Sequence, residues 1–161
     1  IAIELKSGSS DILSRVKSLM AERKSLISEV AQLRKDMALG GSSSGQDELK
    51  SEDLSGVNFL AKQLNGIPGK ELPALIDGYK KKLSSGVILL ISENDGKVAV
   101  ASGVTKDLLS NISAVDIVKT AANKLGGKGG GGRPDLAQAG GSSMDGVTTA
   151  IDAVRSLIVS K

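Results

Sequence analysis

A regular spacing of apolar residues near the N-terminus is the feature that most constrains the fold of this chain. The residues recur at alternating intervals of four and three, which is the heptad pattern of a helix with one apolar seam. The seam comprises Ile12, Val16, Leu19, Arg23, Leu26, Val30, Leu33 and Met37, with Arg23 as its one polar interruption. A helix over residues 12–37 is roughly 39 Å long at about 1.5 Å per residue. Because the seam is long and the remaining surface is charged, the pattern favours a coiled-coil or helix-hairpin arm over a helix buried in a globular core.

The composition changes abruptly after this helix. Residues 40–47 read Gly-Gly-Ser-Ser-Ser-Gly-Gln-Asp, which is typical of a flexible linker. We therefore expect a helical arm over residues 1–39, a linker over 40–55 and a globular domain over 56–161. The chain begins with Ile1 rather than Met, and we interpret it as a fragment of a longer protein.

The globular part combines strand and helix patterns. Aliphatic density and alternation predict strands over residues 57–64, 87–91 and 97–102, the last two joined by a turn at 94–96. Amphipathic spacing predicts helices over 70–83, 113–125 and 144–158. The segment 126–132 is predicted as a glycine loop, with room for a short strand near it. This order predicts an α/β (α+β) sandwich in which helices cover a small mixed sheet.

The composition excludes several classes of function. The 161 residues contain neither Cys nor His, which removes thiolate nucleophiles, Ser-His-Asp relays and zinc fingers. Any metal site would have to consist of oxygen ligands. One Phe and one Tyr cannot form a stacking platform for single-stranded nucleic acid. The longest aliphatic run, residues 87–91, is too short to span a membrane.

The glycine-rich segment that follows residue 125 is the main candidate for a binding site. Four basic residues and no acidic one lie between positions 117 and 134, although the net charge of the whole chain is only +3. Backbone N–H groups in glycine turns form concavities that bind anions. The segment matches neither a dinucleotide fingerprint, which must follow a strand, nor a P-loop, because Lys128 precedes Gly129 rather than Ser or Thr. The alternative is a flexible surface loop with solvated lysines.

The same segment closely resembles a known signature. Residues 126–141 read Gly-Gly-Lys-Gly-Gly-Gly-Gly-Arg-Pro-Asp-Leu-Ala-Gln-Ala-Gly-Gly, similar to the C-terminal signature of bacterial alanyl-tRNA synthetases in their DHH-associated domain. The arm, linker, strands and helices also follow that family's order, so the resemblance covers the whole chain. This chain has four glycines between Lys128 and Arg133, where the family's usual form has three.

The resemblance implies a non-catalytic, tRNA-binding module of a cytoplasmic ligase. In the family this part engages the elbow of tRNA(Ala) and assists aminoacylation and editing, for which upstream domains use ATP and zinc. The fragment itself would then have no catalytic residue, cofactor, metal ligand or membrane partner. Candidate contacts to the sugar-phosphate backbone are Lys119, Lys124, Lys128, Gly129, Gly130, Gly131, Gly132, Arg133 and Gln138. Secondary candidates are Lys80, Lys81 and Lys82, which could instead simply offset a helix macrodipole.

Three other interpretations stay open at this stage. The seam could drive homodimerisation, through the arm or together with the globular domain. The domain could be the nucleic-acid-binding part of a DHH-type phosphoesterase. An enzymatic site could also recruit Asp135, Asp145 and Asp152 as metal ligands, but aspartates seven positions apart on one helix face are usually solvated surface residues. We expect Asp135 to bond backbone N–H groups of its own loop.

Overall fold

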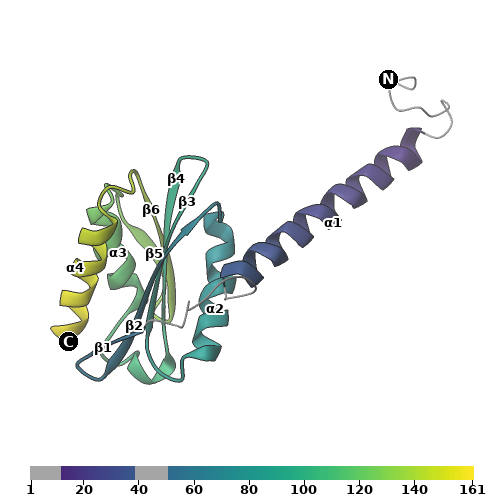
Figure 1. The fold of residues 1–161 in the computed structure, drawn as a ribbon. Coiled ribbons are helices and arrows are strands. Elements are labelled where there is room, and N and C mark those ends of the chain that lie inside the picture. The colour runs from purple at the N-terminus through teal and green to yellow at the C-terminus, as the bar shows by residue number, and fades with distance from the viewer. Residues whose placement is uncertain (1–11, 39–50) are drawn as a thin grey trace.

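The computed structural model describes residues 12–38 and 51–161 (Figure 1). One long helix, α1 (Ile12–Ala38), precedes a six-stranded sheet and three further helices. The strands are β1 (Glu52–Leu54), β2 (Val57–Asn65), β3 (Val87–Asn94), β4 (Lys97–Val104), β5 (Gly130–Arg133) and β6 (Leu136–Gly141). The helices are α2 (Leu72–Lys82), α3 (Ala114–Lys124) and α4 (Val147–Val159), with single 3₁₀ turns at Gly69–Glu71 and Lys106–Leu108.

The predicted helices and strands are present, with ends that shift by a few residues. Ser113 caps α3 as a Ser at this position should, because its Oγ accepts a hydrogen bond from Val115 N at 3.3 Å. Asp95 and Gly96 both have positive φ, which suits the tight turn of the β3–β4 hairpin. The predicted linker over residues 40–47 lies outside the described residues.

The sheet is mixed, in the order β1-β2-β3-β4-β6-β5. The pairing of β2 with β3 is parallel, because α2 carries the chain back between them, and the other four pairings are antiparallel. In two places the structure differs from the sequence-based expectation. Residues 52–54, which we assigned to the linker, form β1. The glycine segment, predicted as a loop with room for one short strand, contributes to a two-stranded hairpin of β5 and β6.

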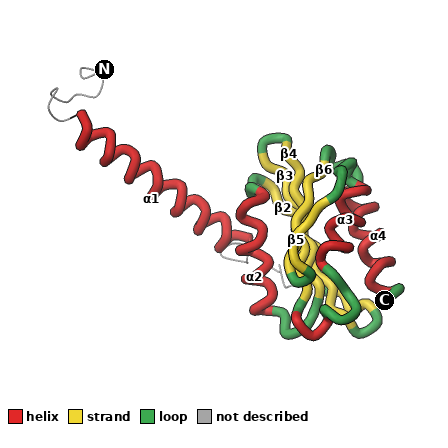
Figure 2. The backbone as a smooth tube through the Cα atoms, turned by 180° about the vertical axis from the view of Figure 1, so that it is seen from behind, coloured by secondary structure: helices red, strands yellow, loops and turns green. Residues whose placement is uncertain are grey.

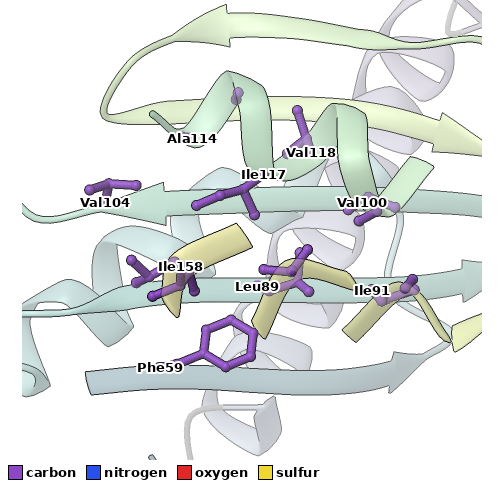
Figure 3. Close-up of a cluster of buried hydrophobic side chains, with 14 of the residues drawn as sticks. Phe59, Leu89, Ile91, Val100, Val104, Ala114, Ile117, Val118 and Ile158 are labelled. Atoms are coloured by element: carbon purple, nitrogen blue, oxygen red, sulfur yellow. The ribbon is translucent and has the colours of Figure 1, made fainter. Parts of the chain in front are cut away.

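Helices cover the two faces of the sheet unequally. One face carries α2 and the other carries α3 and α4 (Figure 2). Successive residues of β3 point to opposite faces, so Ile88 and Leu90 pack toward α2 while Leu89 and Ile91 pack toward α3 and α4 (Figure 3). This two-sided burial explains why the strand is an uninterrupted aliphatic run. Each fully buried Leu or Ile contributes roughly 1.5–3 kcal/mol to the hydrophobic term.

Helix α1 projects away from the sandwich and meets it only near its C-terminal end (Figure 1). There Arg34 Nη1 lies 3.9 Å from Glu71 Oε1. A cleft of about 520 Å³ separates the two parts, and its walls include Leu19, Leu26, Ile27, Val30, Pro68 and Glu71. The apolar seam remains largely open to solvent, since Leu26 is 54% exposed and Met37 is 71% exposed. No helix among the described residues has the length and apolarity to cross a membrane.

Candidate nucleic-acid interface

The glycine-rich segment forms a β-hairpin at one edge of the sheet. Strand β5 pairs with β6 from Gly130↔Ala139 to Arg133↔Leu136, and it is the last strand in the sheet order. Pro134 and Asp135 make the two-residue turn between the strands. The candidate site is therefore a sheet edge built on a rigid scaffold.

Close packing explains most of the glycines. A Cβ at Gly127 would lie 2.0 Å from Gly140 O, and one at Gly130 would lie 2.4 Å from Ala139 Cβ. At Gly132 the conflict would be with Leu136 O at 2.5 Å, and φ there is also positive. Gly129 has a φ of +122°, which favours glycine although its surroundings are open. Within the segment 129–132, only Gly131 could carry a Cβ without conflict. The space around its Cα is open, and its φ does not lie in the left-handed range.

Three separate elements hold the turn of this hairpin in place. Ala114 N, at the start of α3, donates to Pro134 O at 2.8 Å. Val104 N, at the end of β4, donates to Asp135 O at 3.0 Å. Lys80 Nζ, on α2, donates to the same carbonyl oxygen at 2.6 Å. The turn is thus tied to both helical layers and to the neighbouring strand.

The Asp135 carboxylate pairs with cations, not with the loop backbone as we expected from the sequence. Arg133 Nε lies 3.1 Å from Asp135 Oδ1, and Lys80 Nζ lies 3.9 Å from Asp135 Oδ2. Burial lowers the pKa of the Lys80 ammonium, and the nearby carboxylates of Asp135 and Asp77 partly oppose this shift. The turn presents this carboxylate toward Lys80 of α2, which is why it does not bond the backbone of its own loop.

The structure brings some of the candidate residues together and separates others. Arg133 and Lys80 meet at Asp135, on the side of the sheet that α2 covers. Lys119 and Lys124 are exposed on α3, which covers the other side, and exposed Lys128 follows α3 in the loop before β5. Lys128 therefore lies just before the edge strand, and Arg133 is the last residue of that strand. Lys81 and Lys82 are exposed at the C-terminal end of α2.

Gln138 has a structural contact that the sequence did not reveal. Its Nε2 donates to Gly69 O at 2.7 Å, which joins β6 to the 3₁₀ turn before α2. The two residues lie 69 positions apart, so no local pattern could have shown the pairing. The half-buried side-chain amide of Gln138 is therefore already hydrogen-bonded within the protein.

The three aspartates considered as metal ligands occupy separate places. Asp135 pairs with Arg133, Asp152 pairs with Arg155, and Asp145 accepts a hydrogen bond from Ser143 Oγ at 2.6 Å. Over residues 12–38 and 51–161, no three acidic side chains gather into a group that could hold a metal ion.

Comparisons with known proteins agree on one family. The family model described as "DHHA1 domain" matches residues 56–160. The chain is 51% identical over 158 residues to the alanine–tRNA ligase of Ruegeria sp. (strain TM1040), and 50% identical over 158 residues to that of Dinoroseobacter shibae. Each match covers 98% of this chain and 18% of the relative, so the chain spans about a fifth of the length of these ligases.

Solved structures show the same fold. The C-Ala domain of Aquifex aeolicus alanyl-tRNA synthetase aligns with a TM-score of 0.64 and 25% identity, covering 68% of this chain and 98% of that domain. RecJ from Thermus thermophilus, in its complex with Mg²⁺, aligns with a TM-score of 0.57 and 15% identity, covering 92% of this chain and 21% of RecJ. The second likeness concerns the fold alone. This chain belongs to the DHHA1 domain family, and over nearly its whole length it is similar to the C-terminal part of alanyl-tRNA synthetase.

Proposed function

We propose that this chain is the tRNA-binding module of an alanine–tRNA ligase and that it engages the elbow of tRNA(Ala). The observation that carries the proposal is the pair of exposed cations at the edge strand β5, Lys128 in the loop before its glycines and Arg133 as its last residue. The stretch from 117 to 134 contains four basic residues and no acidic one, although the carboxylate of Asp135, the next residue, pairs with Arg133. The similarity to alanine–tRNA ligases supports the choice of RNA.

Recognition would rest on the backbone and shape of the RNA. Basic side chains and N–H groups contact phosphates, and such contacts position a nucleic acid without reading its bases. Phe59 and Tyr79 are both buried, so neither offers a face on which a base could stack. These properties suit a folded RNA corner better than a single strand. Exposed Lys119 and Lys124 would extend the basic surface along α3.

The chemistry of the ligase would reside in other domains of the parent chain. Activation of alanine with ATP and zinc-dependent editing both need groups that this chain lacks, including the His and Cys residues absent from its sequence. The module would act by holding the tRNA while those domains work on its acceptor end.

A gel-shift assay tests the proposal directly. The 161-residue chain should retard a transcript of tRNA(Ala) and should retard a variant with a disrupted elbow much less. Equal retardation of the two transcripts would show that the elbow is not the target. No retardation of either would contradict RNA binding by this chain.

The exposed seam of α1 favours a second role in self-association. Leu19, Leu26 and Val30 line the cleft beside the sandwich and remain open to solvent. Sedimentation of the full chain against residues 51–161 tests this role. A dimer that requires residues 12–38 would support it, and two monomers would exclude it.

A further inference from the structure

Asp135 lies between two cations that differ in how firmly they are held. Its Oδ1 is 3.1 Å from Arg133 Nε, and its Oδ2 is 3.4 Å from Arg133 Nη2 and 3.9 Å from Lys80 Nζ. Two positive charges and one negative charge therefore meet at the tip of the β5–β6 hairpin. A phosphate that approached Arg133 would find its guanidinium already occupied by a carboxylate.

Lys80 is the fixed partner of this group. Its side chain is only 18% exposed, and its Nζ donates to the backbone oxygen of Asp135 at 2.6 Å. Its stem lies over Gly103 of β4, where an added Cβ would come within 2.8 Å of Lys80 Cε. The ammonium can therefore stay beside the turn whether or not Arg133 is present.

Arg133 is the loose partner. Its side chain is 72% exposed, against 34% for Asp135, and it reaches the carboxylate from the strand that forms the sheet edge. An ion pair this exposed contributes little to stability, so opening it costs little. A guanidinium forms two-pronged hydrogen bonds with an RNA phosphodiester as it does with a carboxylate, because each presents two charged oxygens that match the guanidinium fork.

We infer that the Asp135 carboxylate competes with RNA phosphates for the guanidinium of Arg133. When RNA binds, a phosphate replaces the carboxylate at Arg133, and Lys80 keeps the carboxylate at the turn. The inference rests on the proposed role of Arg133 in RNA binding and adds a regulatory element to that site. Asp135 therefore lowers the affinity of the edge for anions by the small cost of opening this ion pair.

The inference predicts opposite effects for substitutions at Asp135 and at Lys80. Asp135→Asn keeps the shape of the side chain but frees Arg133, so RNA binding should become tighter by up to about fivefold, the equivalent of one exposed ion pair. Lys80→Met keeps the apolar stem over Gly103 but releases the turn, so binding should become weaker. An ion pair with a purely structural role would weaken binding in both variants.

The binding should be measured by fluorescence anisotropy of a labelled tRNA(Ala) transcript with the 161-residue chain, across a salt series. The gain from Asp135→Asn should vanish in an Arg133→Ala background, because no guanidinium is left to free. The salt dependence should also steepen, since no carboxylate beside Arg133 then cancels part of the positive charge that displaces counterions from the RNA. Asp152→Asn is the matched control, because Asp152 also pairs with an arginine but lies on α4.

The outcomes separate this inference from the proposed function. Unchanged or weaker binding by folded Asp135→Asn overturns the inference, and so does an equal gain from Asp152→Asn or a gain that survives Arg133→Ala. If Asp135→Asn does not fold, Asp135→Ser takes its place, and failure of both shows that the carboxylate is structural. If wild type binds and Arg133→Ala weakens binding, the proposed function stands whatever Asp135 does. A wild type that does not bind the transcript contradicts both.

Discussion

Helices α1 and α3 show the same kind of apolar periodicity but have opposite surroundings. On α3 the periodic residues Ile117, Val118 and Ala121 are completely buried against the sheet. On α1 the periodic residues stay largely open, and Leu33 is 57% exposed. The period of a sequence thus determines that a helix forms and which face is apolar, but it does not determine what covers that face. The sandwich buries its apolar residues between its own sheet and helices, whereas the apolar residues of α1 are exposed.

The largest expected effect contrasts the core with the arm. Leu89→Ala removes a fully buried side chain from the α3/α4 side of the sheet and should lower the free energy of unfolding by about 2–5 kcal/mol. Leu26→Ala on α1 is the matched change at an exposed site and should cost less than about 0.5 kcal/mol. Urea unfolding of both variants measures the difference. Similar losses would mean that the seam of α1 is buried in solution.

The next effect contrasts two glycines of the same strand. Gly130→Ala places a methyl group 2.4 Å from Ala139 Cβ, and such overpacking should destabilise the domain by about 1–3 kcal/mol. Gly131→Ala enters open space and should change stability by less than about 1 kcal/mol, with a gain expected because alanine restricts the unfolded chain. Thermal unfolding of the two variants measures their stabilities relative to wild type. A Gly131→Ala variant as unstable as Gly130→Ala would contradict the packing described for β5.

A smaller effect concerns a polar atom in the core. Ser102 is completely buried on β4, and its Oγ has no hydrogen-bond partner. Ser102→Ala removes this unsatisfied group and should raise the free energy of unfolding by about 1 kcal/mol. Ser92, equally buried, donates to Ile67 O at 2.6 Å, so Ser92→Ala should lower stability instead. Chemical denaturation measures both changes in the free energy of unfolding. Changes of opposite sign in the two variants would confirm the contrast, and changes of the same sign would refute it.

The elements that the sequence predicted well are those with local signals. The seam of α1, the two-residue turn of the β3–β4 hairpin and the Ser113 cap each depend on residues a few positions apart. Among the elements that it missed, β1 has only three residues, and it exists because β2 offers an edge to pair with. Strand β5 consists of glycine apart from Arg133, and glycine gives no strand propensity.

The candidate site could be predicted only in part. The basic residues around the glycine segment are visible in the sequence, so Lys128 and Arg133 could be named. The partners of those residues come from distant positions, because Lys80 and Asp135 lie 55 residues apart and meet only in the folded sheet. Packing against β6 and α3 likewise shows why Gly127, Gly130 and Gly132 must be glycine, which spacing alone could not.

The most direct test of the account neutralises the two exposed cations at the sheet edge. Lys128→Ala combined with Arg133→Ala should leave the melting temperature unchanged within about 2 °C, since both side chains are exposed and contribute little to stability. Binding to a tRNA(Ala) transcript should weaken by about 1–3 kcal/mol, and the slope of log K against log salt should fall by roughly one for each phosphate that the protein no longer neutralises. The charge-matched control is Arg15→Ala with Lys161→Ala, at exposed positions on α1 and at the end of the chain. We predict near wild-type binding for the control and weak, less salt-dependent binding for the edge variant. Wild-type affinity and an unchanged salt slope in the edge variant would contradict the account.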